Sequence, residues 1–516
     1  MTMRMNLLLG IGTLVLAAPA SAAWQQASSK HFLIYGDMPT EEIRAYATKL
    51  EKFDAAARLI RRMKDPTVGD GNRVHVYVVP TDVDVNHTLG SNAGDVLGYY
   101  DDDVRSPFIV TPRKVRRDLD NRTVPPETVF FHEYTHHLQL QNTNKPMPAW
   151  LSEGFAEFLS NPVFGDDGSV SLGTPAVMRA EMLLKGQWAP LGDLLEGNAI
   201  TLSYVGFWGQ NYAQGWLLNH YLAFEPSRKG QIDDYVRRIS AGENALNAAR
   251  GSFGDIGKLD SELRAYSHTK RFAYLKIDST KLSVAPVTVT PVTAAASQVM
   301  MMRVYAKTGY NALNKGSVLK RVRDIAAKAA NDPLVMRTLA QVEYDNGNYD
   351  EAGVAADAAL KADPTSTEAM VFKGRSFLGK AKKANDPALF KQARTWFMKA
   401  NKADNEDPEP LYLYYRSYRD ANVAAPQSAI DGLKYAAVLA PRDLKLQVRL
   451  GLEYLRQNRL AEAKAALEPV AFMPHAVGEA KYARQAIESV AAGNTQGAIS
   501  LLDKEVLHAD GDDDDA

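Results

Sequence analysis

The chain has 516 residues, which is too long for one hydrophobic core and predicts roughly two to four domains. Its composition, 46% hydrophobic and 23% charged, is ordinary for a globular protein, and a formal net charge of -1 gives no overall field that would favour nucleic acid or acidic lipid. The absence of cysteine excludes disulfides, thiolate metal sites, cysteine nucleophiles and a lipid-modified N-terminal cysteine.

Residues 1–22 have the pattern of a secretory signal peptide. Arg4 gives a weakly positive start, residues 7–18 form a short apolar run, and Ala-Ser-Ala at 20–22 is a small-residue cleavage pattern. The run is too short to span a bilayer comfortably, so we expect cleavage near Ala22, with an uncleaved anchor as the alternative. No later stretch is apolar enough for a membrane helix. Export without disulfides predicts a bacterial periplasmic or secreted protein.

Strands and helices are expected to alternate up to about residue 125. A long amphipathic helix is expected at residues 40–63, because apolar side chains recur on one of its faces. Strands are expected at 31–36, 74–79, 96–101 and 107–111. This alternation predicts an α+β domain.

His132 and His136 carry the strongest chemical signal in the chain. Two prolines followed by Glu127 favour a helix start, and the helix is expected to run to about residue 141. Residues four apart share one face of a helix, so the two imidazoles can bind a single metal ion. Glu133, next to His132, can reach a metal-bound water. The alternative is a helix whose histidines are ordinary surface or core residues.

A second helix is expected to begin near Ala149 and to carry Glu153 and Glu157. Glu153 is suited to be a third ligand, and two histidines with one carboxylate leave an open position, which is typical of catalytic rather than structural zinc. Glu157 is four residues further on. It could accept a hydrogen bond from the non-ligating nitrogen of His132, or it could equally be an exposed helical glutamate.

This residue set predicts hydrolysis with one Zn²⁺ ion as cofactor. The ion would activate water and polarise a carbonyl, while Glu133 would take the proton of the water and pass it to the leaving nitrogen. An oxyanion donor is also needed, and a third, aromatic-rich helix is expected at 207–222. Tyr212 is the first choice, with a packing role as its alternative, and His220 and Tyr204 are reserves.

The other histidines are not expected to bind the metal. His137 points about 100° away from His136 on the helix, so we expect it at the surface or behind the ligands. No role is assigned to the isolated histidines, which are His31, His75, His87, His268, His475 and His508.

The second half of the chain repeats. Residues 279–293, rich in Val, Thr and Pro, are expected to form an extended linker. Beyond them, small residues and prolines recur at the spacing of a 34-residue helix–turn–helix unit, because small side chains allow close helix crossing and proline ends a helix. The matching positions are Ala340, Gly347, Ala352, Ala359 and Pro364, then Gly374, Phe377, Ala393 and Ala400, then Ala429, Ala436 and Pro441, then Gly451, Tyr454 and Ala463.

Further helices are expected at both ends of this array. A weaker pair is expected at about 294–330 and a partial unit at about 483–502. Residues 508–516 are strongly acidic and are expected to be a solvated, disordered tail, with calcium binding as the minor alternative.

Two motifs resemble a known superfamily. His-Glu-Tyr-Thr-His at 132–136, followed by Trp-Leu-Ser-Glu-Gly-Phe-Ala-Glu-Phe at 150–158, resembles the gluzincin, or peptidase-MA-like, zinc metallopeptidases. The resemblance implies Glu153 as the third zinc ligand and Glu157 as the acid that orients His132. It also implies Tyr212, 59 residues after Glu153, as the oxyanion donor.

With residues 30–35 and 212–222 included, the chain is similar to a bacterial family of exported peptidase-MA-like domains of undetermined substrate, members of which can carry tetratricopeptide (TPR) repeats. The resemblance covers about 24–270 and 294–505. Two departures speak against exopeptidase activity: the interval between the second histidine and the glutamate is shorter than in aminopeptidases, and there is no Gly-x-Met-Glu-Asn segment. Residues 98–100 are expected on a strand that lines the cleft.

We therefore expect a multidomain α+β protein, with a zincin-like metallopeptidase domain at 23–278 and an all-α TPR-like solenoid at 294–507. The expected partners are a peptide or protein substrate at the zinc site and a protein in the groove of the repeats, since stacked repeats offer an extended groove. A purely structural solenoid is the alternative. Two other functions remain open, a periplasmic repeat scaffold with a degenerate zinc domain and a zinc hydrolase acting on a non-peptide bond.

Overall fold

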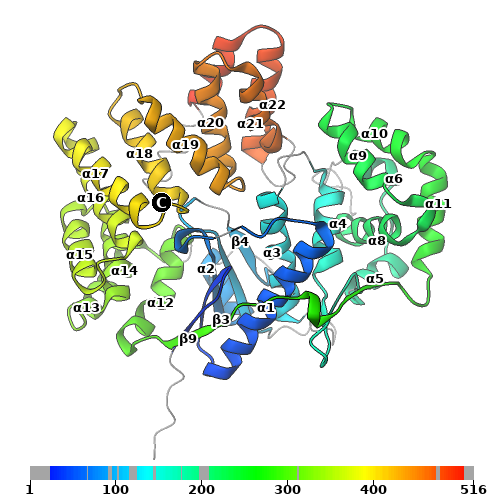
Figure 1. Cartoon of the computed structure of the whole chain (residues 1–516), viewed down its shortest axis with the longest axis horizontal. Helices are drawn as coiled ribbons and strands as arrows, with labels where there is room; N and C mark the ends of the chain where they lie inside the picture. The colour runs from blue at the N-terminus through cyan, green and yellow to red at the C-terminus, as the bar shows by residue number, and fades with distance from the viewer. Residues whose placement is uncertain are drawn as a thin grey trace, which may run out of the picture.

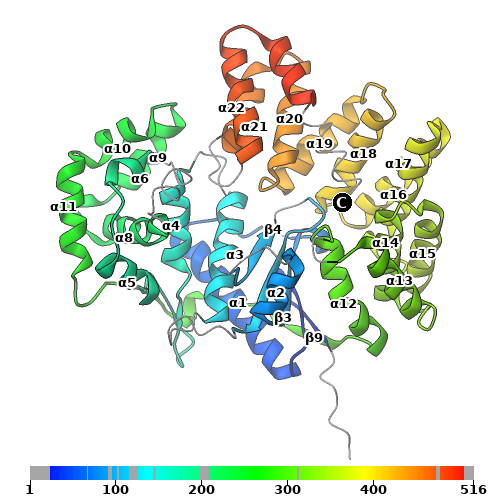
Figure 2. The ribbon, with the colours of Figure 1, turned by 180° about the vertical axis from the view of Figure 1, so that it is seen from behind.

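The computed structural model describes residues 24–66, 68–90, 96–101, 104–115, 125–142, 147–175, 177–196, 209–310, 313–471 and 477–504. The predicted signal peptide and acidic tail lie outside these residues. A central sheet has a lobe of short helices beside it and a curved array of longer helices on its other side (Figure 1). The view from behind shows the same three parts with left and right exchanged (Figure 2).

The central sheet has six strands in the order β4-β5-β3-β2-β1-β9. The strands β2, β3 and β5 are parallel to one another, and β1, β4 and β9 pair antiparallel. The four predicted strands are present, and β4 is shorter than expected. The bounds are β1 Gln25–Ser28, β2 Phe32–Gly36, β3 Val74–Thr81, β4 Tyr99–Asp101, β5 Phe108–Lys114 and β9 Thr288–Pro291.

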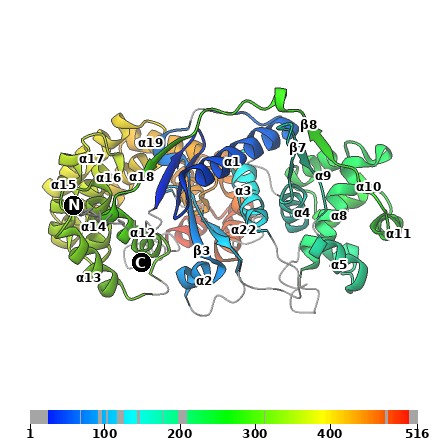
Figure 3. The ribbon, with the colours of Figure 1, turned by 90° about the horizontal axis from the view of Figure 1, so that it is seen from below.

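Helices cover both faces of this sheet. Along β3, Val74 and Val76 belong to the core under α1 (Thr40–Arg61) and α3 (Pro126–Asn142). Tyr77 and Val79 belong to the core on the other face, which includes residues of α12 (Ala294–Lys307); α2 (Asp82–Leu89) packs against β3 and β5. Because both faces are buried, β3 is apolar almost throughout rather than alternating. Figure 3 shows α12 and α1 on opposite sides of the strands.

The predicted linker is extended, but it is part of the sheet. Within residues 279–293, β9 pairs with β1, with Thr290 opposite Gln26, and Arg44 of α1 donates to the carbonyl of Val287 at 2.6 Å. Its Val- and Thr-rich composition also suits a strand. Since α12 covers the sheet directly after β9, the solenoid shares a core with the first half.

A smaller lobe follows the motif helix. It contains a three-stranded antiparallel sheet and seven α-helices among the described residues. The third predicted helix, α8, begins at Gln210 rather than 207, and residues 207–208 lie outside the described part. The bounds are α4 Ala149–Leu159, β6 Val163–Phe164, β7 Val170–Leu172, α5 Val177–Lys185, α6 Leu191–Leu195, α8 Gln210–Phe224, α9 Gln231–Ser240, α10 Ala245–Phe253, α11 Ile256–Ser267 and β8 Leu275–Ile277. Short 3-10 turns lie at Asp70–Asn72, Pro226–Arg228 and Ser279–Lys281.

The second half is a TPR-like solenoid in which consecutive helices pack side by side. Three of them begin with an aspartate cap followed by proline, at Asp332, Asp386 and Asp407, which is a favourable helix start. The helices after α12 are α13 Lys315–Ala326, α14 Pro333–Asp345, α15 Tyr349–Ala362, α16 Thr367–Ala384, α17 Pro387–Ala403, α18 Pro408–Asp420, α19 Gln427–Leu439, α20 Leu444–Arg456, α21 Leu460–Ala471 and α22 Val477–Ala491, with a further helix at 495–504.

The small residues that predicted the repeats lie where helices cross. A Cβ atom on Gly374 would come within 2.4 Å of the Phe397 ring, and one on Gly451 within 2.7 Å of Leu467. A larger residue at either position would force the neighbouring side chain to move. None of the described helices is long and apolar enough to cross a membrane.

Candidate metal centre

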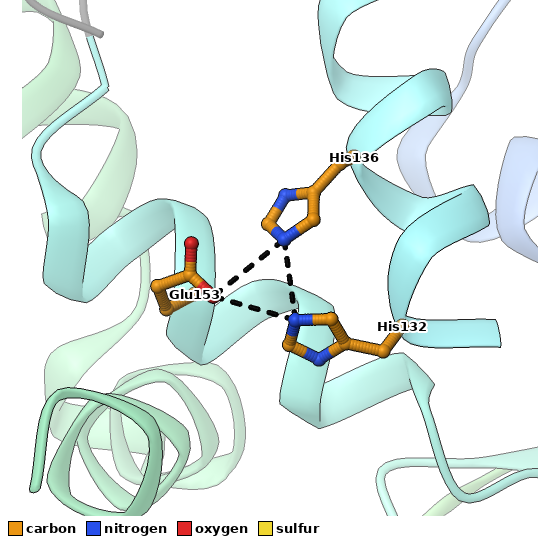
Figure 4. A group of neighbouring side chains, drawn as sticks. All are labelled: His132, His136 and Glu153. Carbon is orange, nitrogen blue, oxygen red and sulfur yellow. Dashed lines mark hydrogen bonds and ion pairs between the residues drawn. The ribbon is translucent and has the colours of Figure 1, made fainter. Parts of the chain in front are cut away.

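Three donor atoms from two helices meet beside the sheet. His132 and His136 lie one turn apart on α3, and Glu153 approaches them from α4 (Figure 4). The two Nε2 atoms are 3.2 Å apart, and Oε2 of Glu153 is 3.3 Å from Nε2 of His132 and 3.5 Å from Nε2 of His136. The sequence-predicted ligand residues are thus brought together.

These separations suit a single zinc ion. Two ligands bound at about 2.05 Å with a tetrahedral angle between them lie about 3.3 Å apart. All three distances between donor atoms are close to that value. Two imidazoles and one carboxylate are also a donor set that zinc prefers, and they leave a fourth position for solvent or substrate.

Close packing of two glycines fixes the position of α4. A Cβ atom on Gly154 would lie 2.3 Å from the backbone of Gly215 in α8, and one on Gly215 would lie 2.8 Å from the carbonyl oxygen of Trp150. The two helix backbones therefore touch. This contact brings Tyr212, one turn before Gly215 on α8, close to the residue that precedes Gly154, which is Glu153.

Glu157 lies behind His132 rather than in solvent. Its side chain is 5% exposed, and its Oε1 is 3.3 Å from Nδ1 of His132. Arg179 of α5 donates two hydrogen bonds to it, from Nε at 3.0 Å and from Nη2 at 2.7 Å. The reading of Glu157 as an exposed helical glutamate is therefore wrong. Sequence reasoning missed Arg179, because no local pattern links residue 179 to residue 157.

His136 also has a hydrogen-bond partner behind it, which is Gln139. Its Nδ1 lies 3.2 Å from Oε1 of Gln139, and Gln139 is held in turn by the hydroxyl of Ser152 at 3.0 Å and by the Ser152 carbonyl at 3.1 Å. In both histidines, Nδ1 contacts an outer partner, and Nε2 points toward the position that a metal ion would occupy. Outer partners of this kind orient the ligands of a metal ion. The three-residue spacing from His136 to Gln139 on one helix face was a signal that could have identified Gln139.

The potential at this point is negative. Burial disfavours a charge on His132, but Glu153 and Glu157 raise its pKa to about 10. Burial would raise the pKa of Glu157, but His132 and Arg179 lower it to about 2, so Glu157 stays ionised. A potential that attracts a proton so strongly also attracts a metal cation.

Tyr212 and Glu133 lie around the same centre. The Tyr212 ring is 5.9 Å from the His132 ring, and the guanidinium carbon of Arg179 is 4.8 Å from the centre of the Tyr212 ring. Burial, together with the charges of Glu153 and Glu133, raises the pKa of Tyr212 above its ordinary value. The phenol therefore keeps its proton and can donate a hydrogen bond. Glu133 is half-buried on α3, within electrostatic reach of Tyr212.

Of the two reserve oxyanion donors, His220 is engaged in a separate set of contacts. The ring nitrogens of His220 are 2.9 Å from the Tyr266 hydroxyl and 2.9 Å from the carbonyl of Ala273, within an aromatic cluster. Burial lowers the pKa of His220 to about 4, so it is a neutral histidine with both ring nitrogens engaged in the core. Tyr204 lies outside the described residues.

His137 is also buried rather than exposed. It stacks on Tyr134 with 5.3 Å between ring centres, and its Nδ1 is 3.0 Å from the hydroxyl of Tyr100 on β4. Burial holds its pKa well below the usual value. Residues 99–101 therefore form an edge strand that contacts the motif helix.

A second cluster also combines an imidazole with carboxylates. Nδ1 of His31 lies 2.8 Å from Oε2 of Glu51 and 3.4 Å from Oδ2 of Asp54. Arg58 and the hydroxyl of Tyr134 both donate to Asp54, at 2.8 and 2.7 Å. Sequence reasoning had assigned His31 no role, and the structure makes it part of a buried ionic network that ties α1 to α3.

The chain was compared with protein families, curated proteins and solved structures, and matches were found among solved structures. No family model matches the chain, and no curated protein matches it. Ten chains of solved structures match. They include TTC0263, described as a thermophilic TPR protein in Thermus thermophilus, with 15% identity over 37% of this chain and 97% of that chain and a TM-score of 0.32.

Two further matches are to MamA. The MamA RS-1 ArsTM double mutant is 20% identical over 34% of this chain and 93% of that chain, with a TM-score of 0.27. MamA 41-end from Desulfovibrio magneticus RS-1 is 21% identical over 34% of this chain and 92% of that chain, with a TM-score of 0.26.

Proposed function

We propose that the chain is an exported zinc metallopeptidase that uses water as the nucleophile and forms no covalent enzyme intermediate. The observation that carries this proposal is the convergence of His132, His136 and Glu153, whose donor atoms are 3.2 to 3.5 Å apart. A zinc ion held by them would supply a Lewis acid that lowers the pKa of water and polarises a substrate carbonyl.

The residues around the proposed zinc position have separate roles in the reaction. Glu133 accepts a proton from the attacking water and returns it to the leaving nitrogen. Tyr212 donates a hydrogen bond to the carbonyl oxygen as negative charge develops there, and its raised pKa keeps it protonated for that purpose. Glu157 and Arg179 hold the His132 ring in one orientation.

A Glu133→Gln variant tests this mechanism. Glutamine has nearly the same shape but cannot take a proton, so the variant should keep its zinc and lose cleavage of casein or of a peptide library. Glu127→Gln is a matched control, since it makes the same substitution in the first turn of the same helix, where Glu127 forms a half-exposed ion pair with Lys49. Equal cleavage by wild type and Glu133→Gln would rule out the mechanism.

A second candidate is favoured by the solenoid of paired helices. In this candidate the chain is an exported TPR scaffold that binds a partner protein, and its zinc domain is inactive or acts on a non-peptide bond. Stacked helical repeats offer an extended surface suited to a protein partner. Absence of bound zinc from purified wild type and control alike would favour the scaffold, whereas bound zinc without proteolysis would favour another hydrolase.

A further inference from the structure

A cavity of about 570 Å³ lies between the second face of the sheet and the solenoid. Its size is within the range of pockets that hold small molecules. Its walls come from the amino ends of β2, β3 and β5, from α12 and α14, and from the loops that precede α16 and α18. We call it the junction cavity. It is on the opposite face of the sheet from α3, so it is distinct from the candidate metal centre.

Arg303 of α12 is the most buried cation in its wall. The residue is 2% exposed, and its Nη2 donates to Oε1 of Glu368 at 2.6 Å. Among the described residues, its Nε and Nη1 make no well-formed hydrogen bond, and the hydroxyl of Tyr77 is a nearby group that interacts with the guanidinium. Buried donors without acceptors are unfavourable, so an acceptor that enters the cavity would stabilise this side chain.

Two further cations line the same end. Nη1 of Arg337 donates to Ser366 at 3.3 Å, but its Nε is 3.5 Å from Oε2 of Glu368, too long for a well-formed hydrogen bond. Burial would raise the pKa of Glu368, yet Arg303, Arg337 and Lys307 lower it to about 2. Three cations thus surround one ionised carboxylate, which leaves an excess of positive charge.

His75 of β3 adds a neutral donor to this end. The residue is buried, and its Nδ1 has no hydrogen-bond partner among the described residues. Burial and the charges of Lys307 and Arg303 hold its pKa well below the usual value. A neutral imidazole can donate one hydrogen bond to an anion without adding to the charge.

The acidic residues at the other end are already engaged. Asp404 accepts the backbone N–H of Gly71 at 3.1 Å, and Glu409 accepts from Arg375 at 2.6 Å. Asp407 caps α18, and burial together with the nearby Glu409 raises its pKa well above the usual value. The printed ion pairs of Arg303 and Arg337 are both with Glu368 rather than with these acids.

We propose that the junction cavity binds a small ligand through an oxyanion group, a carboxylate or a phosphate, held by Arg303 and Arg337 with His75 as a further donor. Planar guanidinium groups bind both kinds of oxyanion with paired hydrogen bonds. The site is independent of the proposed peptidase activity and would exist in a scaffold as well.

The test measures binding of two simple probes to the full-length protein. The thermal unfolding midpoint and calorimetric affinity are compared in inorganic phosphate, in succinate and in chloride at equal ionic strength. We expect phosphate or succinate to raise the midpoint above its value in chloride, and whichever does so identifies the oxyanion. In Arg337→Gln the affinity should fall by about tenfold or more, since a charge-assisted hydrogen bond is lost.

Two further variants keep the test decisive. Arg303→Lys retains the charge of the buried residue but not its planar group, so it should fold and bind the probe more weakly. Arg321→Gln, an exposed change on α13, should bind like wild type. Equal binding by Arg337→Gln and wild type would overturn the proposal, as would a wild-type midpoint that neither probe raises above its value in chloride. Binding only of a peptide carboxyl terminus would also overturn it, because the occupant would not be a small ligand.

Discussion

The candidate metal centre and the cluster around His31 both combine imidazole with carboxylate groups, yet their surroundings differ. In the second cluster, Arg58 donates directly to Asp54, a carboxylate that would otherwise be a ligand, and His31 lies between Glu51 and Asp54. In the metal centre, Arg179 donates instead to Glu157, which stands behind an imidazole.

We therefore use the position of the arginine to distinguish a structural cluster from a candidate metal site. A guanidinium on a ligand carboxylate supplies the positive charge that an ion would otherwise supply. A guanidinium on an outer carboxylate orients the ligand and leaves the central negative potential in place. Variants in both clusters can test this comparison.

The largest effect on zinc affinity is expected for Glu153→Ala. It removes a ligand, so zinc affinity should fall by about 1,000-fold or more, beyond the ~10–100-fold typical of a lost outer partner. Glu51→Ala should leave zinc affinity unchanged. Competition of each purified protein with a calibrated zinc chelator gives the affinities, and a zinc affinity of Glu153→Ala equal to that of wild type would contradict the assignment of the ligands.

Arg58→Met should act on stability instead. Removal of one partner of a buried ion pair leaves Asp54 without its countercharge, and we expect a loss of about 3 kcal/mol or more in the free energy of unfolding. Zinc affinity should remain unchanged. Arg62→Met, an exposed change just beyond the same helix, serves as the control in urea denaturation. A zinc affinity that fell as far as in Glu153→Ala would mean that the two clusters are not functionally separate.

Arg179→Met should give an intermediate effect. Without the arginine, Glu157 loses two hydrogen bonds and holds His132 less firmly, so zinc affinity should fall by about 10–100-fold. Arg179→Lys should recover only part of this loss, because an ammonium retains the charge but not the paired geometry. The same chelator competition measures both variants, and wild-type affinity in Arg179→Met would show that the outer pair does not support the metal.

The contrast between the clusters also shows what the sequence could predict. His132 and His136 follow from helix geometry alone, and Glu153 from a second helix a short loop away, so local spacing was enough. Arg179 and the pairing of β9 with β1 join segments that are far apart in sequence, and no local pattern records such contacts.

The shared core was missed for a related reason. A Val- and Thr-rich stretch such as 279–293 predicts extended backbone equally well in a linker and in an edge strand. Only the position of β1 decides between them. The repeats, in contrast, were predictable because each helix pair contacts mainly its neighbours, so glycines such as Gly374 leave a periodic local signal.

The smallest effect is expected from a change of pH, which should alter the stability of the fold through the His31 cluster. Burial lowers the pKa of His31, but Glu51, Asp54 and Asp65 raise it more, so the net shift is upward from 6.5. A raised pKa stabilises the fold fully below 6.5, and this contribution is lost as the pH rises through the folded-state value. Burial raises the pKa of Glu51, but its contacts with His31 lower it below 4.5, so its contribution is present above 4.5 and is lost as the pH falls.

Together these shifts define a window between about pH 4.5 and 6.5 in which the His31 cluster is fully charged. The difference in unfolding midpoint between wild type and His31→Gln should be largest there and smaller on both sides. His87→Gln, at an exposed histidine outside the cluster, should show no such maximum. A difference that kept growing above pH 6.5 would mean that neutral His31 stabilises the fold through packing. In that case the ionic character assigned to this cluster would be wrong, and the contrast with the metal centre would rest on the position of Arg58 alone.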